Sequence, residues 1–196
     1  MASETGLMKT IVVNLSFFKA GWLASVFTAA SSMPVAGTVV IGLAVLVHLL
    51  ISKNANAEFR LLAIAALIGL VWESFLVMTG LVEYNAASVL PGLAQYWIVA
   101  MWVLFATTIN VGMRWLKKNI YVAAIAGAIG GPMSFLAGSK AGAVSFADPT
   151  VSLIVIGIGW AVLLPVLVQV ALRNDDASAS SDSDVSNNAV AGEVRA

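Results

Sequence analysis

Two charged side chains lie inside apolar stretches of the sequence, where a charge is costly. Glu73 interrupts the run Gly69–Met78, and Lys19 interrupts the first apolar stretch of the chain. A charge at the centre of a membrane span costs at least ~2.5 kcal/mol, so such residues face other helices and pair. At about 1.5 Å of rise per residue, Lys19 and Glu73 lie within about one helical turn of the same depth. The sequence therefore predicts that they pair near the midplane, directly or through water.

Amide, hydroxyl and guanidinium side chains form a second polar layer. Thr107, Asn110 and Arg114 recur at three- and four-residue steps, which places them on one face of a helix, and Asn14 lies at a similar depth. Amides in lipid usually find partners through interhelical hydrogen bonds. Two interpretations stay open: these side chains join helices, or they line a cavity whose mouth attracts an anion. The candidate polar cavity comprises Lys19, Glu73, Asn14, Asn110, Thr107 and Arg114.

A glycine–glycine–proline sequence predicts a break in the fifth apolar stretch. Pro132 has no amide hydrogen, so the carbonyl of Ala128 loses its partner, and Gly130 and Gly131 weaken the helix further. Gly127 and Gly131 also have the GxxxG spacing that allows two helices to approach closely. Broken helices near the midplane frame ligand sites in transporters. A kink that serves packing alone is the alternative.

The sequence contains no recognised enzyme motif. It has no phosphate loop, no HExxH, no GxSxG and no dinucleotide fingerprint, so we do not expect an enzyme of a known class. There is no cysteine, which removes thiolate nucleophiles and thiolate metal ligands. The single histidine, His48, has no carboxylate next to it in sequence, and we expect it at the membrane interface. No metal and no cofactor is predicted. No nucleic-acid partner is predicted either, since the net charge is zero.

The elements that position these residues are predicted to be membrane-spanning helices. Of the 196 residues, 60% are hydrophobic and 10% are charged, whereas soluble domains have about 25% charged residues. A cleaved signal peptide in place of the first span is disfavoured, because that stretch is long and carries Asn14 and Lys19. Since a span needs about 20 apolar residues, the sequence predicts an all-α bundle of about six transmembrane helices, at about 10–30, 34–52, 60–80, 95–115, 119–138 and 150–172.

Lysine and arginine are concentrated on one side of the predicted bundle. If the spans alternate, Lys140 is the basic residue of one side, and the other side holds Lys9, Lys53, Arg60, Arg114, Lys117, Lys118 and Arg173. Basic loops stay in the cytoplasm, which places both termini there. We expect a multi-pass membrane protein. Membrane lipid is its expected neighbour, and a second copy or another membrane protein is its expected partner.

The composition changes abruptly after residue 173. The sequence RNDDASASSDSDVSNNAVAGEVRA is rich in serine, aspartate and asparagine. Such a segment cannot bury enough apolar surface to offset the entropy of ordering. The sequence therefore predicts a transmembrane domain at 1–173 and a disordered cytoplasmic tail at 174–196.

Four stretches of the sequence together resemble a known family. They are NLSFFKAGW, LVWESF, YWIVAMWVLFATTINVGMRWL and GAIGGPMSFLAGSKAGAVSF, in the first, third, fourth and fifth spans. The chain, apart from its tail, resembles the bacterial domain-of-unknown-function family 2878 of inner-membrane proteins. The resemblance implies a small polytopic protein of the bacterial inner membrane and no particular activity. The positions that match best are Trp22, Thr107, Thr108, Asn110, Gly130, Gly131 and Pro132.

Three functions are compatible with these residues. The first is binding or transport of a small or lipid-like molecule in a polar intramembrane cavity, with Glu73 as the proton-sensitive or cation-contacting group. The second is a non-catalytic accessory subunit of a membrane complex, docked through the glycine faces. The third is a membrane enzyme that modifies lipid, with Glu73 as acid or base. The polar layers favour the first.

Overall fold

The computed structural model describes residues 2–86 and 90–193, with side chains from 4 to 86 and 90 to 177. Helices build the fold, and one short two-stranded antiparallel ladder joins two connections at one end of the bundle. The elements are α1 (Ala2–Ala30), α2 (Pro34–Ile51), α3 (Ala55–Met78), β1 (Glu83–Tyr84), α4 (Tyr96–Ala106), the 3-10 helix η1 (Arg114–Lys118), α5 (Ile120–Lys140), β2 (Val144–Ser145) and α6 (Pro149–Glu193).

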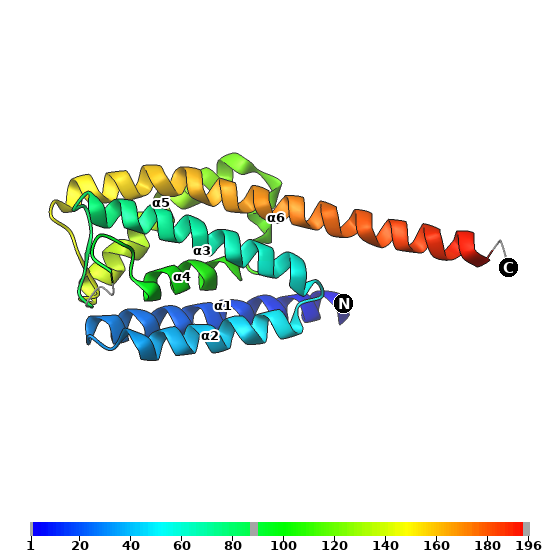
Figure 1. The fold of residues 1–196 in the computed structure, drawn as a ribbon, viewed down its shortest axis with the longest axis horizontal. Coiled ribbons are helices and arrows are strands. Elements are labelled where there is room, and N and C mark those ends of the chain that lie inside the picture. Colours follow the sequence, from blue (N-terminus) through cyan, green and yellow to red (C-terminus); the bar gives the residue numbers. More distant parts are fainter. Residues whose placement is uncertain (1, 87–89, 194–196) are drawn as a thin grey trace.

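The helices pack as three antiparallel pairs that lie side by side (Figure 1). α1 packs with α2, α3 with α4, and α5 with α6, and the α3–α4 pair lies between the other two. Among the described residues, five helices are long and apolar enough to cross a membrane, and α4 is a shorter apolar helix. The prediction of an all-α bundle of about six helices is confirmed.

The fourth predicted span, 95–115, is not one helix. α4 has eleven residues, which give it a length of about 16 Å, about half of the hydrocarbon thickness of a bilayer. At its end, the hydroxyls of Thr107 and Thr108 donate to the carbonyls of Leu104 and Phe105, at 2.7 and 2.6 Å. Threonines that bond nearby carbonyls in this way compete with the helix. The chain continues in turns through residue 113, so Thr107, Asn110 and Arg114 do not share a helical face.

The predicted break in the fifth span is not found there. Pro132 lies inside α5, which continues without interruption from Ile120 to Lys140. The glycine packing predicted for this helix is present, because a Cβ at Gly127 or Gly131 would collide with Trp160 of α6. α6 packs against this stretch, and the packing offsets the weakness that two adjacent glycines and a proline give to a helix.

Asparagine side chains begin two of the helices. Asn54 accepts a hydrogen bond from the amide of Ala57 at 3.1 Å, and Asn119 accepts one from the amide of Tyr121 at 2.9 Å. Each satisfies an amide that the first turn of a helix leaves unpaired. The Asn54 cap follows α2 by only three residues, which brings the last turn of α2 next to the first turn of α3.

The predicted boundary at residue 173 falls inside α6, which continues to Glu193. Asn174 donates to the carbonyl of Ala57 at 3.1 Å, and the Lys117 ammonium lies 2.6 Å from the Asp175 carboxylate. These contacts hold the start of the predicted tail against the bundle. Farther on, α6 projects away from the other helices (Figure 1). The disorder of 174–196 and the two-part division stay predictions.

Candidate functional site

A cavity of about 740 Å³ opens at the end of the bundle where the start of α1, the α2–α3 turn and the segment after α4 meet. Its volume lies in the range of about 300–1,000 Å³ that is common for ligand sites. We call it the basic cavity, because four cationic side chains and two carboxylates line it. They are Lys9, Lys53, Arg114, Lys117, Glu58 and Asp175.

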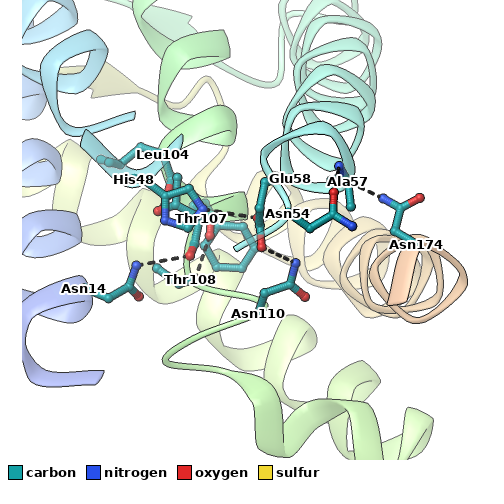
Figure 2. Close-up of polar contacts among 11 residues, drawn as sticks. Asn14, His48, Asn54, Ala57, Glu58, Leu104, Thr107, Thr108, Asn110 and Asn174 are labelled. Carbon is teal, nitrogen blue, oxygen red and sulfur yellow. Dashed lines mark hydrogen bonds and ion pairs between the residues drawn. The ribbon is translucent and has the colours of Figure 1, made fainter. Parts of the chain in front are cut away.

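A buried carboxylate joins three elements at the wall of this cavity. Glu58 of α3 lies 3.1 Å from His48 Nε2 of α2 through one oxygen, and its other oxygen accepts from Asn110 Nδ2 at 2.8 Å. Figure 2 shows Glu58 between these two partners. Because an ionised carboxylate only accepts hydrogen bonds, His48 donates from Nε2 when Glu58 is charged. His48 and Glu58 are each 9% exposed, so both side chains are buried within the protein.

The unwound segment after α4 supplies backbone to the same cavity. Asn14 of α1 donates through Nδ2 to the carbonyl of Thr107 at 3.1 Å (Figure 2). The end of a helix leaves its last carbonyls without helical partners, and Asn14 satisfies this one. Irregular backbone at membrane depth is tolerated where it is buried in protein or lines a polar cavity. The segment after α4 is partly buried in protein and also lines the cavity.

Two amide oxygens in the cavity wall have no partner among the described residues. They are Oδ1 of Asn14 and Oδ1 of Asn110, and both atoms are buried. A buried acceptor without a donor costs ~1–3 kcal/mol. These two atoms face protein, and the groups that the cavity presents at its mouth are cations. This arrangement matches a ligand that has an anionic group.

Four of the six residues of the predicted cavity come together in the basic cavity. Asn14, Thr107, Asn110 and Arg114 line it, whereas Lys19 and Glu73 do not. His48 and Glu58 line it as well and were missed from the sequence. Their signal is the short turn between α2 and α3, which brings residues ten positions apart onto facing helix ends.

The predicted ion pair between Lys19 and Glu73 is not formed. Glu73 is 0% exposed and accepts hydrogen bonds from the phenol of Tyr84 at 2.5 Å and from Nε1 of Trp102 at 2.8 Å. Gly69, one turn earlier on α3, makes room for the Trp102 ring, since a Cβ there would collide with it. Lys19 is exposed on α1 and lies at a different cavity.

Lys19 and Glu73 do not pair because their helices are not close neighbours in the bundle. Residue spacing gives the depth of Lys19 and Glu73, but it does not say which helices are neighbours. α1 packs against α2 and α4, and α3 packs mainly against α4 and α6. Tyr84 lies outside the spans, in β1. Burial raises the pKa of its phenol well above the ordinary value, and the neighbouring Glu73 carboxylate raises it further, so Tyr84 remains a donor.

The described residues offer no ready metal site. Among them, no three histidine, cysteine, aspartate or glutamate side chains are grouped to hold an ion. The His48–Glu58 pair supplies two ligands at most. The arrangement suits hydrogen bonding and charge recognition.

The fold and the site together define a polytopic α-helical membrane protein with a half-length fourth helix and a polar cavity beside its unwound end. The chain belongs to the family described as "Protein of unknown function (DUF2878)", whose model matches residues 11–166. The family resemblance of the sequence is thereby confirmed. No curated protein and no solved structure matches the chain.

Proposed function

We propose that this is a bacterial inner-membrane protein that binds a small anionic or lipid-like molecule in the basic cavity. The observation that carries the proposal is that Lys9, Lys53, Arg114 and Lys117 line one cavity together with polar side chains. The His48–Glu58–Asn110 cluster fixes one wall of this cavity. The cavity thus has the features of a preformed ligand site, which are a few placed polar groups within largely apolar walls.

The charges favour an anion. The ammonium of Lys117 is paired with Asp175, and Glu58 is paired with His48. Lys9, Lys53 and Arg114 have no ion-pair partner among the described residues. Guanidinium and ammonium groups are the usual partners of phosphate and carboxylate. A phosphate or carboxylate head is therefore the chemistry that fits the mouth.

The deeper walls are apolar. Val13, Phe17, Val47 and Leu104 line the cavity beside the polar groups. This combination suits a molecule with a polar head and a short hydrocarbon part. A lipid head that enters from the surrounding leaflet and a soluble phosphate ester share this chemistry.

A buried apolar layer lies along α3 beyond Glu58. Leu61, Leu62 and Ala65 follow Glu58 on this helix and are buried in one cluster with Ala106 and Ile109. The layer separates Glu58 from Glu73, which lies farther along the same helix. This separation supports binding rather than an open path through the bundle.

The orientation is part of the proposal. The cavity mouth gathers cations, whereas the opposite end of the bundle carries Lys140 at the end of α5. The positive-inside rule places the mouth and both termini in the cytoplasm. A cytoplasmic ligand or the head of an inner-leaflet lipid would then reach the site.

Calorimetric titration of the purified full chain in neutral detergent tests the proposal, with glycerol phosphate as the soluble probe and lysophosphatidic acid as the lipid probe. Arg114→Gln should weaken binding of either probe about tenfold, which corresponds to ~1.4 kcal/mol. Lys140→Gln, at the other end, is the matched control and should bind like wild type. Tighter binding of the lipid indicates that the apolar walls hold a chain. Equal affinities of wild type, Arg114→Gln and Lys140→Gln would contradict the proposal.

A further inference from the structure

A second cavity, of about 410 Å³, lies between α1 and α5. We call it the lateral cleft. It shares no lining residue with the basic cavity, and any inference about it is independent of the proposed function. α1 contributes Phe18, Lys19 and Trp22, and the other walls come from α5, α6 and the segment around η1.

At Gly130, the floor of the lateral cleft is bare backbone. A Cβ at Gly130 would meet no heavy atom within 4 Å, so the cleft is open above this residue. Gly127 and Gly131, on either side, are instead packed against Trp160. Aromatic rings of Phe18, Trp22 and Phe105 form the sides. The result is a slot with apolar walls.

One hydrogen bond crosses the cleft from α1 to α5. Trp22 donates through Nε1 to the hydroxyl of Ser134 at 3.2 Å. α1 and α5 pack much less closely with each other than each does with its own helix partner. The Trp22–Ser134 bond therefore limits the cleft at one end and leaves the rest accessible from the side.

Lys19 is the charged residue of this cleft. No carboxylate is among its lining residues, and no hydrogen bond or ion pair of Lys19 is formed within the described part of the chain. Lys19 lies inside the membrane-spanning part of α1, where an unpaired cation costs at least ~2.5 kcal/mol. A cation beside an apolar slot is complementary to an anion that carries a hydrocarbon chain.

We propose that the lateral cleft binds a single-chain anionic amphiphile. Its carboxylate or phosphate contacts Nζ of Lys19, and its chain lies over Gly130 between the aromatic rings of α1 and the α5 backbone. The ligand enters from the lipid, because the cleft opens between two helices rather than at the end of the bundle. Fatty acids and lysophospholipids that carry a terminal phosphate share this chemistry.

Tryptophan quenching tests the proposal, because Trp22, Trp115 and Trp160 line the cleft. The purified full chain in neutral detergent is titrated with dibromostearate, with a dibromoacyl lysophosphatidic acid and with the uncharged dibromo alcohol of the same chain. Saturable quenching by one or both anionic probes, and weaker quenching by the alcohol, is the expected result. Comparison of the two anionic probes tells which head is preferred.

Two glycine substitutions provide a matched pair. Gly130→Leu fills the slot and should weaken binding of the anionic probes about tenfold. Gly42→Leu of α2 is the control, since Gly42 also has no neighbour within 4 Å and lies outside the cleft. Leucine has a higher helix propensity than glycine, so both substitutions should favour the helix in the same way. Equal affinities of the two variants would overturn the proposal, because quenching would then report general partition into the micelle.

Lys19 provides a second test that does not depend on Gly130→Leu folding. Lys19→Gln should bring the affinity of the anionic probes down to that of the alcohol, and Lys19→Arg should retain it. Binding of glycerol phosphate in the basic cavity should not change in either variant. If the alcohol binds wild type as tightly as dibromostearate, or if Lys19→Gln changes nothing, the proposal is wrong.

Discussion

The phenol of Tyr84 donates a 2.5 Å hydrogen bond to the buried carboxyl of Glu73. Tyr84 belongs to β1, which pairs with β2 of the α5–α6 connection. The bond therefore ties two connections at one end of the bundle to the third helix. Glu73 accepts hydrogen bonds from both Tyr84 and Trp102, and these bonds link α3 to α4 and to the segment between them.

Tyr84→Phe should lower the free energy of unfolding by ~1–3 kcal/mol. The substitution removes a donor from a fully buried acceptor, which is left with Trp102 alone. Thermal unfolding in detergent measures the change. Tyr121→Phe is the matched control, because Tyr121 is 77% exposed and should lose little. Equal losses in both variants would contradict the assignment.

The Tyr84 contribution should also depend on pH. Burial, reinforced by the Glu73 carboxylate, raises the pKa of Tyr84 above its ordinary value of 10.0. A raised folded pKa means that the stabilisation is complete below 10.0 and is lost as the pH rises toward the folded value. Wild type should therefore lose more stability than Tyr84→Phe between neutral pH and pH values above 10.0. Parallel stability curves for the two proteins would rule this out.

Lys19 and Glu73 should be energetically independent. In a double-mutant cycle of Lys19→Gln and Glu73→Gln, the coupling energy should be within about 0.5 kcal/mol of zero, as for residues without shared partners. An ion pair in the membrane interior would give a much larger value. Thermal unfolding of the four proteins measures the coupling energy. A coupling energy above ~1 kcal/mol would show that Lys19 and Glu73 do form an ion pair.

The sequence predicts how deep each polar residue lies in the membrane better than it predicts which residues lie next to it. Asn14 and Asn110 come together because depth alone nearly suffices for residues near one end of the bundle. Glu73 needs a lateral neighbour, and periodicity does not tell which helix provides it. The break after Ala106 was missed because threonine hydroxyls that bond the helix backbone leave no clear mark in hydropathy.

The pairing of His48 with Glu58 was missed for a related reason. Each residue lies at the end of a different helix, and neither is unusual by itself at such a position. The Asn54 cap and the short turn bring them together, and this geometry is fixed by packing rather than by spacing along one helix. The glycines of α5, in contrast, could be interpreted directly, since GxxxG spacing itself indicates close approach.

Two adjacent glycines of α5 should respond in opposite ways to alanine. A Cβ at Gly131 would collide with the Trp160 ring, so Gly131→Ala should destabilise the protein by ~1–3 kcal/mol through overpacking. Gly130 faces open space, and Gly130→Ala should stabilise by up to ~1 kcal/mol through helix propensity. Thermal unfolding of the two variants shows whether each substitution raises or lowers the stability. The same sign for both would show that α5 and α6 are not packed in this way.

Asn110 should stabilise the protein through Glu58. Asn110→Ala removes the donor to one oxygen of a carboxylate that is 9% exposed, so the free energy of unfolding should fall by ~1–3 kcal/mol. Asn56→Ala, at an exposed position of α3, is the control and should lose much less. Thermal unfolding in detergent provides the comparison.

A double-mutant cycle identifies the partner. If Asn110 acts through the Glu58 carboxylate, Asn110→Ala should cost less in a Glu58→Gln background, with a coupling energy of about 0.5–3 kcal/mol. Glutamine retains the volume of glutamate and removes the charge that makes the missing donor costly. Additive losses would instead show that Asn110 stabilises the unwound segment by itself. In that case the wall of the basic cavity would not depend on the link from α3 to the end of α4.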